Sequence, residues 1–334
     1  MNPGKILLIG AGRWGINHLR AWLTLGVDLH VADSNDQTLL KCQEMGVSRD
    51  RLSRTHHDFM REVDAVDIVT PAETHHPICC EAIDLGKDLF VEKPLALTSA
   101  DSADIVRRAG EKNLILQVGH IFRYEPPSQF IKKLVDARLL GEVKWLRGNF
   151  SGFKRPRSDS GVTVADAIHF VDLFNYILGK LPRSVNARLL DILGRNMDDN
   201  SWLWLDYGDV FATIEVGYFS PLKKREVLVV GSEKSVVVDY TVQQDKVKIY
   251  ANRHHRENGE WKAVEGDVHT TEFDPEEPLL IELRAFLSSI RTRTPPLADG
   301  QSGVDAVRVV EALLESSRRN SPVRLAHGEQ VCGK

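Results

Sequence analysis

The sequence has no long apolar run and little cysteine. In its 334 residues no uninterrupted apolar stretch approaches the roughly 18 residues that a membrane-spanning helix needs. Neither the apolar core of a signal peptide nor a cleavage site precedes Lys5. The four cysteines, Cys42, Cys79, Cys80 and Cys332, include no Cys-x-x-Cys pair. We therefore expect a cytoplasmic protein with reduced thiols and no contact with a membrane.

Positive charge is not in excess either. The chain has 43 Lys and Arg residues against 47 Asp and Glu residues, a formal net charge of −4, which argues against a nucleic-acid partner. Hydrophobic content of 42% and charged content of 27% are typical of a soluble globular protein. A chain of this length favours two domains. We find no internal repeat and no low-complexity tract.

Histidine occurs in three adjacent pairs, His56-His57, His75-His76 and His254-His255. The side chains of neighbouring residues diverge on a regular element, and no cluster of cysteines or carboxylates in the sequence completes a ligand set. We therefore predict no metal site.

A glycine-rich motif stands near the start of the chain. The apolar run from Ile6 to Ile9 leads into Gly10-x-Gly12-x-x-Gly15, which predicts a buried strand, a tight turn and a helix. Gly10 permits the turn, Gly12 lets the backbone approach a pyrophosphate, and Gly15 allows the helix to pack closely on the strand. The N–H groups at the helix N-terminus attract phosphates.

An acidic residue follows at the expected distance. A second apolar strand ends in Asp33, 23 residues after Gly10, close to the spacing of the residue that binds the ribose. A carboxylate there accepts hydrogen bonds from the ribose hydroxyls and repels a 2′-phosphate, so NAD is favoured over NADP. The cation Arg13 keeps NADP as the alternative cofactor. A glycine-rich turn without a ligand is the alternative. The contacts predicted from these two segments are Gly10, Gly12, Arg13, Trp14, Gly15, Asp33 and Ser34.

Strands and helices alternate through the first 120 residues. Repeated β-α units with short connections predict a parallel, doubly wound sheet with its ligand at the carboxyl ends of the strands. The predicted strands are 5–10, 27–33, 53–55, 65–70, 88–91 and 114–119, and the predicted helices are 14–25, 36–45, 76–85 and 99–112.

After residue 119 consecutive strands joined by short turns indicate a mostly antiparallel sheet. The predicted helices are 127–139, 164–178, 282–290 and 304–318, and the predicted strands are 142–150, 184–190, 201–207, 210–219, 225–231, 235–240 and 246–251. We therefore predict an α/β Rossmann domain over residues 1–121 and an α+β domain over residues 122–334. The large open sheet of the second domain is expected to bind substrate and to join subunits into a homodimer or homotetramer; the C-terminal helix is free to pack back on the first domain.

Two further segments carry candidate chemistry. Lys93, in Glu92-Lys93-Pro94, follows a predicted strand where the dinucleotide is expected, and a lysine there can stabilise negative charge on a substrate oxygen. A surface lysine before a loop is the alternative. The apolar helix predicted over residues 164–178 carries Asp166, His169, Asp172 and Asn175 at every third position. These four form one stripe, and because the helix contains no Lys, Arg or Glu, we favour the wall of a cleft over a solvent-facing stripe.

These motifs, together with Thr70-Pro71, resemble the glucose–fructose oxidoreductase and inositol dehydrogenase family over essentially the whole chain. The segment from Pro71 to His75 matches that family's Pro-x-x-x-His. The resemblance implies an NAD(P)-dependent enzyme that oxidises a sugar or polyol hydroxyl, with Lys93 and His169 as the catalytic pair and Asp172 at the substrate. It adds cofactor contacts at Thr70, Pro71, His75, Glu92 and Lys93.

One position departs from the family pattern. The family's aspartate lies four residues before the histidine, at Ala165 here, whereas Asp166 lies only three before His169. Either Asp166 takes over through a local shift of the helix, or the aspartate's role is altered or lost. We favour participation, because helical spacing puts Asp166 beside His169, where a carboxylate raises the pKa of the imidazole.

The resemblance and the charges also suggest substrate contacts. Residues 118–126 resemble the segment that joins the two domains in members acting on nucleotide sugars, which implies that Arg123 faces the substrate, next to Tyr124. In the basic loop before the catalytic helix, Arg155 and Arg157 can meet a substrate phosphate or carboxylate. A solvated basic loop is the alternative.

Three hypotheses follow. The first is an NAD-dependent dehydrogenase or reductase acting on a secondary hydroxyl or ketone of a sugar, polyol or nucleotide sugar, with His169 as acid/base and Lys93 holding the reacting oxygen. The second is a dinucleotide-sensing regulator of the same fold without turnover, which the displaced Asp166 supports. The third, an oligomeric scaffold, rests on the open sheet and is compatible with the first.

Overall fold

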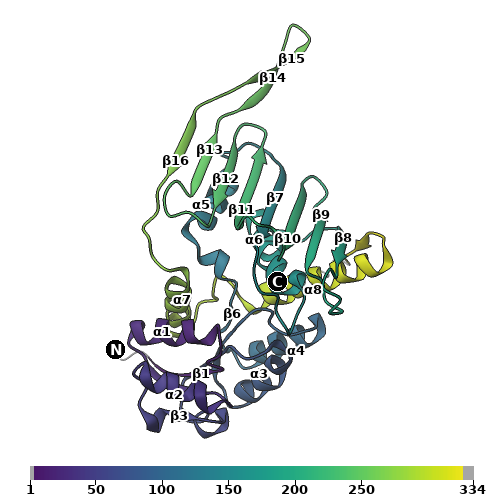
Figure 1. The fold of residues 1–334 in the computed structure, drawn as a ribbon. Coiled ribbons are helices and arrows are strands. Elements are labelled where there is room, and N and C mark those ends of the chain that lie inside the picture. The colour runs from purple at the N-terminus through teal and green to yellow at the C-terminus, as the bar shows by residue number, and fades with distance from the viewer. Residues whose placement is uncertain (1–3, 326–334) are drawn as a thin grey trace. The chain divides into compact units, whose positions relative to one another are not determined.

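The computed structural model describes residues 4–325, which form two compact units (Figure 1). Within these residues the first unit contains 4–124 and 276–307, and the second contains 125–275 and 308–325. Cys332 lies outside the described residues. The other three cysteines are free thiols. No helix between residues 4 and 325 is both long enough and apolar enough to span a membrane.

The first unit is built on a parallel sheet of six strands in the order β3-β2-β1-β4-β5-β6. The strand order doubles back beside β1, as in a doubly wound dinucleotide-binding sheet. The strands are β1 (Lys5–Ile9), β2 (Asp28–Ala32), β3 (Leu52–Ser53), β4 (Ala65–Ile68), β5 (Asp88–Val91) and β6 (Leu116–Val118). The helices are α1 (Gly15–Leu25), α2 (Asp36–Glu44), α3 (His75–Asp84), α4 (Ser99–Glu111) and α7 (Pro278–Thr292).

Helices cover both faces of this sheet because β1 is apolar on both sides. Ile6 and Leu8 join a core with residues of α1 and α7, whereas Leu7 and Ile9 join a second core with residues of α3 and α4. Successive side chains of a strand point to opposite faces, and each fully buried side chain of this size contributes roughly 1.5–3 kcal/mol. The prediction of a doubly wound α/β domain is confirmed.

The second unit is built on a nine-stranded sheet in the order β16-β13-β12-β11-β7-β10-β9-β8-β17. Its pairings are antiparallel except for that between β7 and β10, so the mostly antiparallel sheet is also confirmed. The strands are β7 (Val143–Ser151), β8 (Ser184–Leu190), β9 (Asn200–Asp206), β10 (Phe211–Gly217), β11 (Lys224–Gly231), β12 (Ser235–Asp239), β13 (Val247–Tyr250), β16 (Val268–Thr271) and β17 (Val323–Arg324). The helices are α5 (Pro126–Asp136) and α6 (Ile168–Leu178); α8 (Gly300–Arg319) crosses the boundary between the units.

Helix α6 packs on one face of this sheet. A Cβ added to Gly148 of β7 would lie 2.6 Å from Cδ2 of Phe170, so β7 needs a glycine where α6 crosses it. A π-helical turn, Thr163–Ala167, precedes α6, where the sequence predicted uninterrupted α-helix from residue 164. The turn winds each residue through a smaller angle than an α-helix does, so Asp166 does not continue the regular spacing of His169 and Asp172.

The structure contains a hairpin that was not predicted from the sequence, in which β14 (Arg253–Glu257) pairs with β15 (Glu260–Val264). Nearly all of its residues are exposed, including Trp261, which is 72% exposed. Its strands therefore lack the apolar alternation that marks a half-buried strand. The turn Asn258-Gly259 has positive φ at both residues, 50° and 88°, and Asn-Gly is the strongest local signal for such a hairpin.

Candidate active site

The glycine-rich turn between β1 and α1 forms a cradle of bare backbone. Gly10 has φ +90°, and a Cβ there would lie 2.9 Å from Cγ2 of Thr70; a Cβ on Gly15 would lie 2.0 Å from the carbonyl oxygen of Gly10. Both positions therefore need glycine for the fold itself. A Cβ on Gly12 would meet nothing within 4 Å. The fold does not need glycine at position 12, but a pyrophosphate approaching the backbone does, so the residues present fit a dinucleotide.

Asp33 joins this turn to the end of β2. Its Oδ2 accepts a hydrogen bond from the backbone N–H of Ala11 at 2.8 Å, and its Oδ1 accepts one from Asn35 at 2.9 Å. The next residue, Ser34, accepts a bond at its carbonyl from the exposed Arg54 guanidinium at 3.4 Å. Asp33 is therefore held where a carboxylate would bind an adenosine ribose. Arg54 could not be placed near Asp33 from the sequence, because only the tertiary fold brings this cation to this position.

A buried ion network lies behind the turn. His18 of α1 donates from Nδ1 to Asp67 at 2.8 Å and from Nε2 to Glu92 at 3.2 Å. Burial alone would lower the pKa of His18, but the charges and hydrogen bonds of the two carboxylates outweigh it and raise that pKa to about 10. Trp14 donates to the same Oε1 of Glu92 at 2.8 Å, and the backbone N–H of Lys93 donates to Oε2 at 3.0 Å. Glu92 thus links the glycine-rich turn to the backbone of the predicted catalytic lysine.

His75 connects two loops next to Lys93. Its Nδ1 lies 2.9 Å from the carbonyl oxygen of Pro94, and its Nε2 lies 2.9 Å from that of Thr70. Burial lowers the pKa of His75, although the two carbonyl oxygens oppose that effect. The imidazole is therefore neutral and donates to one carbonyl at a time. His75, predicted as a cofactor contact, holds the loop that contains Thr70 and Pro71.

Arg123 and Tyr124 each form a hydrogen bond with the backbone of the segment before α8. Both lie on a 3-10 turn, Ile121–Tyr124, and both are buried. Arg123 donates to the carbonyl of Leu297 at 2.9 Å, and the Tyr124 hydroxyl accepts from the N–H of Ala298 at 3.2 Å. These bonds fix the end of the first unit, and a role at the substrate stays a prediction for both residues.

In the second unit His169 lies in the first turn of α6, and its ring stacks on Phe150 at a centroid distance of 5.8 Å. Asp166 is buried in the preceding π-helical turn, where its Oδ2 accepts a hydrogen bond from Nζ of Lys154 at 2.7 Å. Asp172 is 1% exposed. Asn175 accepts a hydrogen bond from the buried Tyr207 hydroxyl at 2.9 Å, so this member of the predicted stripe supports the core.

The three cations of the basic loop before this turn, Lys154, Arg155 and Arg157, differ in burial and in contacts. Arg155 is exposed; Arg157 is exposed too and binds Asp159 through two nitrogens at 2.9 and 2.7 Å. Lys154 is half-buried. Burial lowers the pKa of Lys154, while Asp166 opposes that effect. The cation that binds the turn before α6 is therefore Lys154 rather than either predicted arginine.

The structure corrects one expectation about histidine pairs. His56 and His57 do not diverge: Nε2 of His56 and Nδ1 of His57 lie 3.1 and 2.7 Å from the two carboxylate oxygens of Glu81. They lie on a 3-10 turn, His56–Asp58, rather than on a strand or α-helix. A second set of potential ligands, His76, Cys80 and Asp104, also comes together.

Arginine side chains occupy the second of these sets. Arg107 and Arg108 hold Asp104 with hydrogen bonds of 2.6 and 2.7 Å and keep its pKa well below the usual range. A cation would have to displace both guanidinium groups. We assign no metal role to either set.

The fold and the glycine cradle define a two-domain oxidoreductase that binds NAD. A profile described as the NAD-binding Rossmann fold of an oxidoreductase family matches residues 4–120, and one for the C-terminal alpha/beta domain of that family matches residues 132–325. The chain therefore belongs to the Gfo/Idh/MocA family. The predictions of the family, the oxidoreductase class and the NAD cofactor are confirmed.

Two relatives match this chain over nearly their whole length. UDP-N-acetylglucosamine 3-dehydrogenase of Acidithiobacillus ferrooxidans is 26% identical over 312 residues, 92% of this chain and 94% of that enzyme. The NAD⁺-dependent scyllo-inositol 2-dehydrogenase of Bacillus subtilis is 25% identical over 342 residues, 96% of each chain. The WlbA dehydrogenase from Bordetella pertussis, solved in complex with NADH and UDP-GlcNAcA, has the same fold, with a TM-score of 0.81 at 20% identity and coverage of 98% of this chain and 100% of that one.

Proposed function

We propose that the protein transfers a hydride between NAD and a secondary hydroxyl or ketone of a sugar, polyol or nucleotide sugar. The observation that carries this proposal is the open backbone at Gly12, between two glycines that the fold requires, next to the Asp33 carboxylate. The relatives named above act on an N-acetylhexosamine nucleotide and on an inositol, which supports a cyclic polyhydroxylated substrate.

The proposed chemistry assigns one role to each of two residues. His169 removes the hydroxyl proton as general base and returns it in the reverse direction. Lys93 donates a hydrogen bond to the same oxygen and stabilises its developing charge. Bound NAD supplies the hydride acceptor at nicotinamide C4. Lys93 belongs to the first unit and His169 to the second, so the proposal requires both to reach one substrate oxygen.

Neighbouring groups position these two residues. Glu92 fixes the backbone at Lys93, and the stacked Phe150 ring orients His169. Asp166 acts through Lys154, which already occupies one of its oxygens, and Asp172 anchors a neighbouring substrate hydroxyl. This arrangement keeps the family's two catalytic residues although the family's aspartate position holds Ala165.

The experiment is a turnover assay with NAD and a panel of hexoses, inositols, hexuronates and UDP-hexoses, followed by NADH absorbance. We expect turnover of at least one substrate and a loss of roughly 10²–10⁴-fold in kcat for His169→Ala with unchanged NAD affinity. Tight NAD binding without turnover of any member, in either direction, would instead identify a dinucleotide-sensing regulator.

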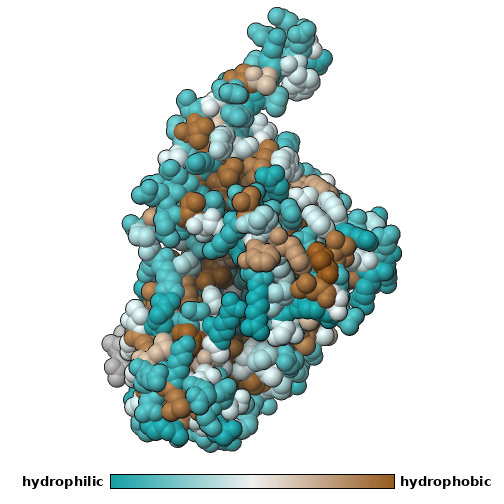
Figure 2. All heavy atoms as spheres, in the orientation of Figure 1, coloured by the Kyte–Doolittle hydropathy of each residue, from teal (hydrophilic) through white to brown (hydrophobic). Residues whose placement is uncertain are grey.

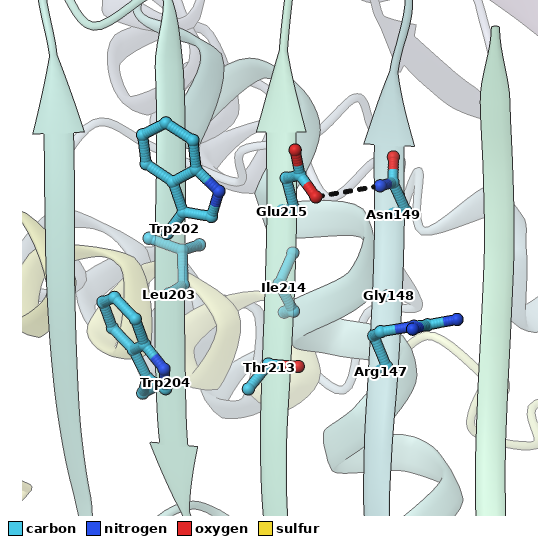
Figure 3. Close-up of a pocket in the computed structure, with 9 residues that line it drawn as sticks. All are labelled: Arg147, Gly148, Asn149, Trp202, Leu203, Trp204, Thr213, Ile214 and Glu215. Atoms are coloured by element: carbon cyan, nitrogen blue, oxygen red, sulfur yellow. Dashed lines mark hydrogen bonds between the residues drawn. The ribbon is translucent and has the colours of Figure 1, made fainter. Parts of the chain in front are cut away.

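We also propose that subunits associate through the open face of the nine-stranded sheet. On the face opposite α6, Trp202 of β9 and Phe211 of β10 are 38% and 45% exposed. Apolar residues interrupt the hydrophilic surface over β9 and β10 (Figure 2). A pocket on this face is lined by both tryptophans of β9 and by the Asn149–Glu215 hydrogen bond of 3.1 Å (Figure 3). Apolar surface of this kind marks an interface, and Trp202→Glu should reduce the mass of the particle measured by light scattering.

A further inference from the structure

Three polar side chains of the second unit gather around the Phe150 ring. The guanidinium carbon of Arg225 lies 3.3 Å from the ring centroid, and Nζ of Lys154 lies 5.1 Å from it. His169 stacks on the same ring. The proposed general base and two cations therefore contact one aromatic side chain. The sequence around Arg225 contains no sign of this position, because the residue lies at the start of a strand with ordinary alternation of apolar and polar residues.

Positive charge in this cluster is only partly neutralised. Asp166 pairs with Lys154, and the exposed Arg157 pairs with Asp159. Arg225 instead donates to two backbone carbonyls, those of Ser151 at 2.9 Å and Lys224 at 2.6 Å. Within residues 4–325 no carboxylate lies within ion-pair distance of it, so its remaining N–H groups are available to a ligand.

Burial makes the partly uncompensated positive charge of Arg225 and Lys154 less favourable. It lowers the pKa of Arg225, with only the charge of Asp166 opposing it. It also lowers the pKa of Lys154, and the neighbouring Arg225 and Arg157 push in the same direction. Half-buried cations that repel one another are stabilised by an anion that binds between them.

A hydroxyl group beside the cluster provides an independent observation. Tyr218 is 2% exposed, and its hydroxyl has no hydrogen-bond partner among the described residues. The ammonium group of Lys154 lies 5.2 Å from the centroid of the Tyr218 ring. A buried polar group without a partner is unusual, and a donor whose ring lies next to the Lys154 ammonium group is suited to an acceptor that a ligand brings.

We propose that Arg225, with Lys154 and the Tyr218 hydroxyl, forms an anion subsite that selects substrates with a carboxylate or phosphate group near the reacting hydroxyl. The guanidinium fork binds either group through paired hydrogen bonds, and the Phe150 ring fixes its plane. This inference rests on the proposed function, because it places the anion beside His169. It narrows the substrate class from sugars in general to anionic sugars, either hexuronates or sugars linked to phosphate.

The first test compares matched substrates with wild type, Arg225→Gln and Arg225→Lys. The pairs are a hexose against its hexuronate, which tests the carboxylate, and a hexose against its UDP derivative, which tests the phosphate. We expect wild type to prefer one anionic member, and Arg225→Gln to lose roughly 10- to 100-fold in kcat/KM for it. The kcat/KM for the neutral hexose should fall much less than that for the anionic member, and Arg225→Lys should recover part of the loss. The matched control is Arg256→Gln, which removes an exposed arginine from β14.

A binding measurement separates this proposal from the proposed function. Calorimetric titration of the NAD-loaded protein with glucuronate, UDP and inorganic phosphate should detect binding in wild type and Arg256→Gln but not in Arg225→Gln, even if no sugar is oxidised. The proposal is overturned if Arg225→Gln binds these anions as wild type does, if wild type binds none of them, or if Arg225→Gln weakens neutral and anionic substrates equally.

Discussion

The Nδ1 of His18 donates to Oδ2 of Asp67 at 2.8 Å, with both side chains fully buried. The same imidazole donates from Nε2 to Glu92, so a single buried cation bridges two buried carboxylates. Its pKa of about 10 means that it carries its charge throughout the physiological range. The charge holds Glu92, which in turn bonds to Trp14 in the glycine-rich turn and to the backbone of Lys93.

This network predicts a dependence of stability on pH. The folded-state pKa of His18 is raised from an ordinary value of 6.5, so its contribution is fully present below pH 6.5 and is lost as the pH rises toward 10. Across this window the free energy of unfolding should lose up to about 1.4 kcal/mol per pH unit through this group. His18→Gln should reduce stability near pH 6 by roughly 3–5 kcal/mol and flatten the slope, as measured by urea unfolding at several pH values.

His30 provides a matched control for that experiment. It is also buried, and burial lowers its pKa, so its titration affects stability only below pH 6.5. His30→Gln should therefore keep the wild-type slope between pH 7 and 10. Equal slopes for wild type and His18→Gln would show that His18 is not the charged link between the two carboxylates.

The glycines of the cradle should separate cofactor binding from folding. Gly15→Ala places a methyl group against the Gly10 carbonyl oxygen, so we expect a loss of roughly 1–3 kcal/mol in stability. Gly12→Ala meets no protein atom and should leave the melting temperature nearly unchanged, while weakening NAD binding by roughly tenfold or more because the methyl group takes the space of the pyrophosphate. Calorimetric NAD titration beside thermal unfolding checks both; a Gly12→Ala protein with wild-type NAD affinity would place the dinucleotide elsewhere.

Cofactor choice should depend on Asp33. In Asp33→Ser the charge that repels a 2′-phosphate is lost, while Arg54 remains beside the carbonyl of Ser34. We expect the KM for NAD to rise roughly 10- to 100-fold and that for NADP to fall. Asp33→Ser with Arg54→Gln should lose the NADP gain but keep the NAD loss. An unchanged preference for NAD in Asp33→Ser would refute the ribose assignment.

The parts of this protein that were predictable from sequence are those encoded locally. The glycine motif, the apolar runs and the acidic residue after the second strand lie within one β-α-β unit, and the unbroken apolar run of β1 specifies burial on both faces. The His18 network was not predictable, because its three members lie on α1, on β4 and after β5 and meet only in the folded sheet. The role of Arg225 was not predictable either, because its unpaired charge becomes evident only when the fold places Lys154 and Phe150 around it.

The π-helical turn before α6 illustrates a different limit. The stripe of Asp166, His169 and Asp172 assumed a constant helical angle, but a π-helical turn cannot be read from the apolar pattern of this segment, since four of the five residues of the turn, Thr163, Ala165, Asp166 and Ala167, are buried. The turn delivers Asp166 to Lys154. The participation of Asp166 in catalysis, favoured from its helical spacing, stays a prediction.

Asp166→Asn tests that role. The substitution removes the negative charge paired with Lys154 while keeping the shape of the side chain, so the cluster of Lys154 and Arg225 gains net positive charge. Inorganic phosphate should then inhibit turnover at a concentration roughly tenfold lower than in wild type. The pKa of Lys154 should fall further, because burial lowers it already and Asp166 is the group that opposes burial.

The pH–rate profile distinguishes this action through Lys154 from direct action on His169. If Asp166 stabilised the imidazolium of His169, its loss would move the acid limb of kcat to lower pH; because its carboxylate is bound by Lys154, we expect the limb to stay in place. Asp209→Asn, which removes an exposed carboxylate paired with Lys180, should change neither phosphate inhibition nor the limb. A downward shift of the limb in Asp166→Asn with wild-type phosphate inhibition would return Asp166 to the catalytic histidine and contradict its role in the anion subsite.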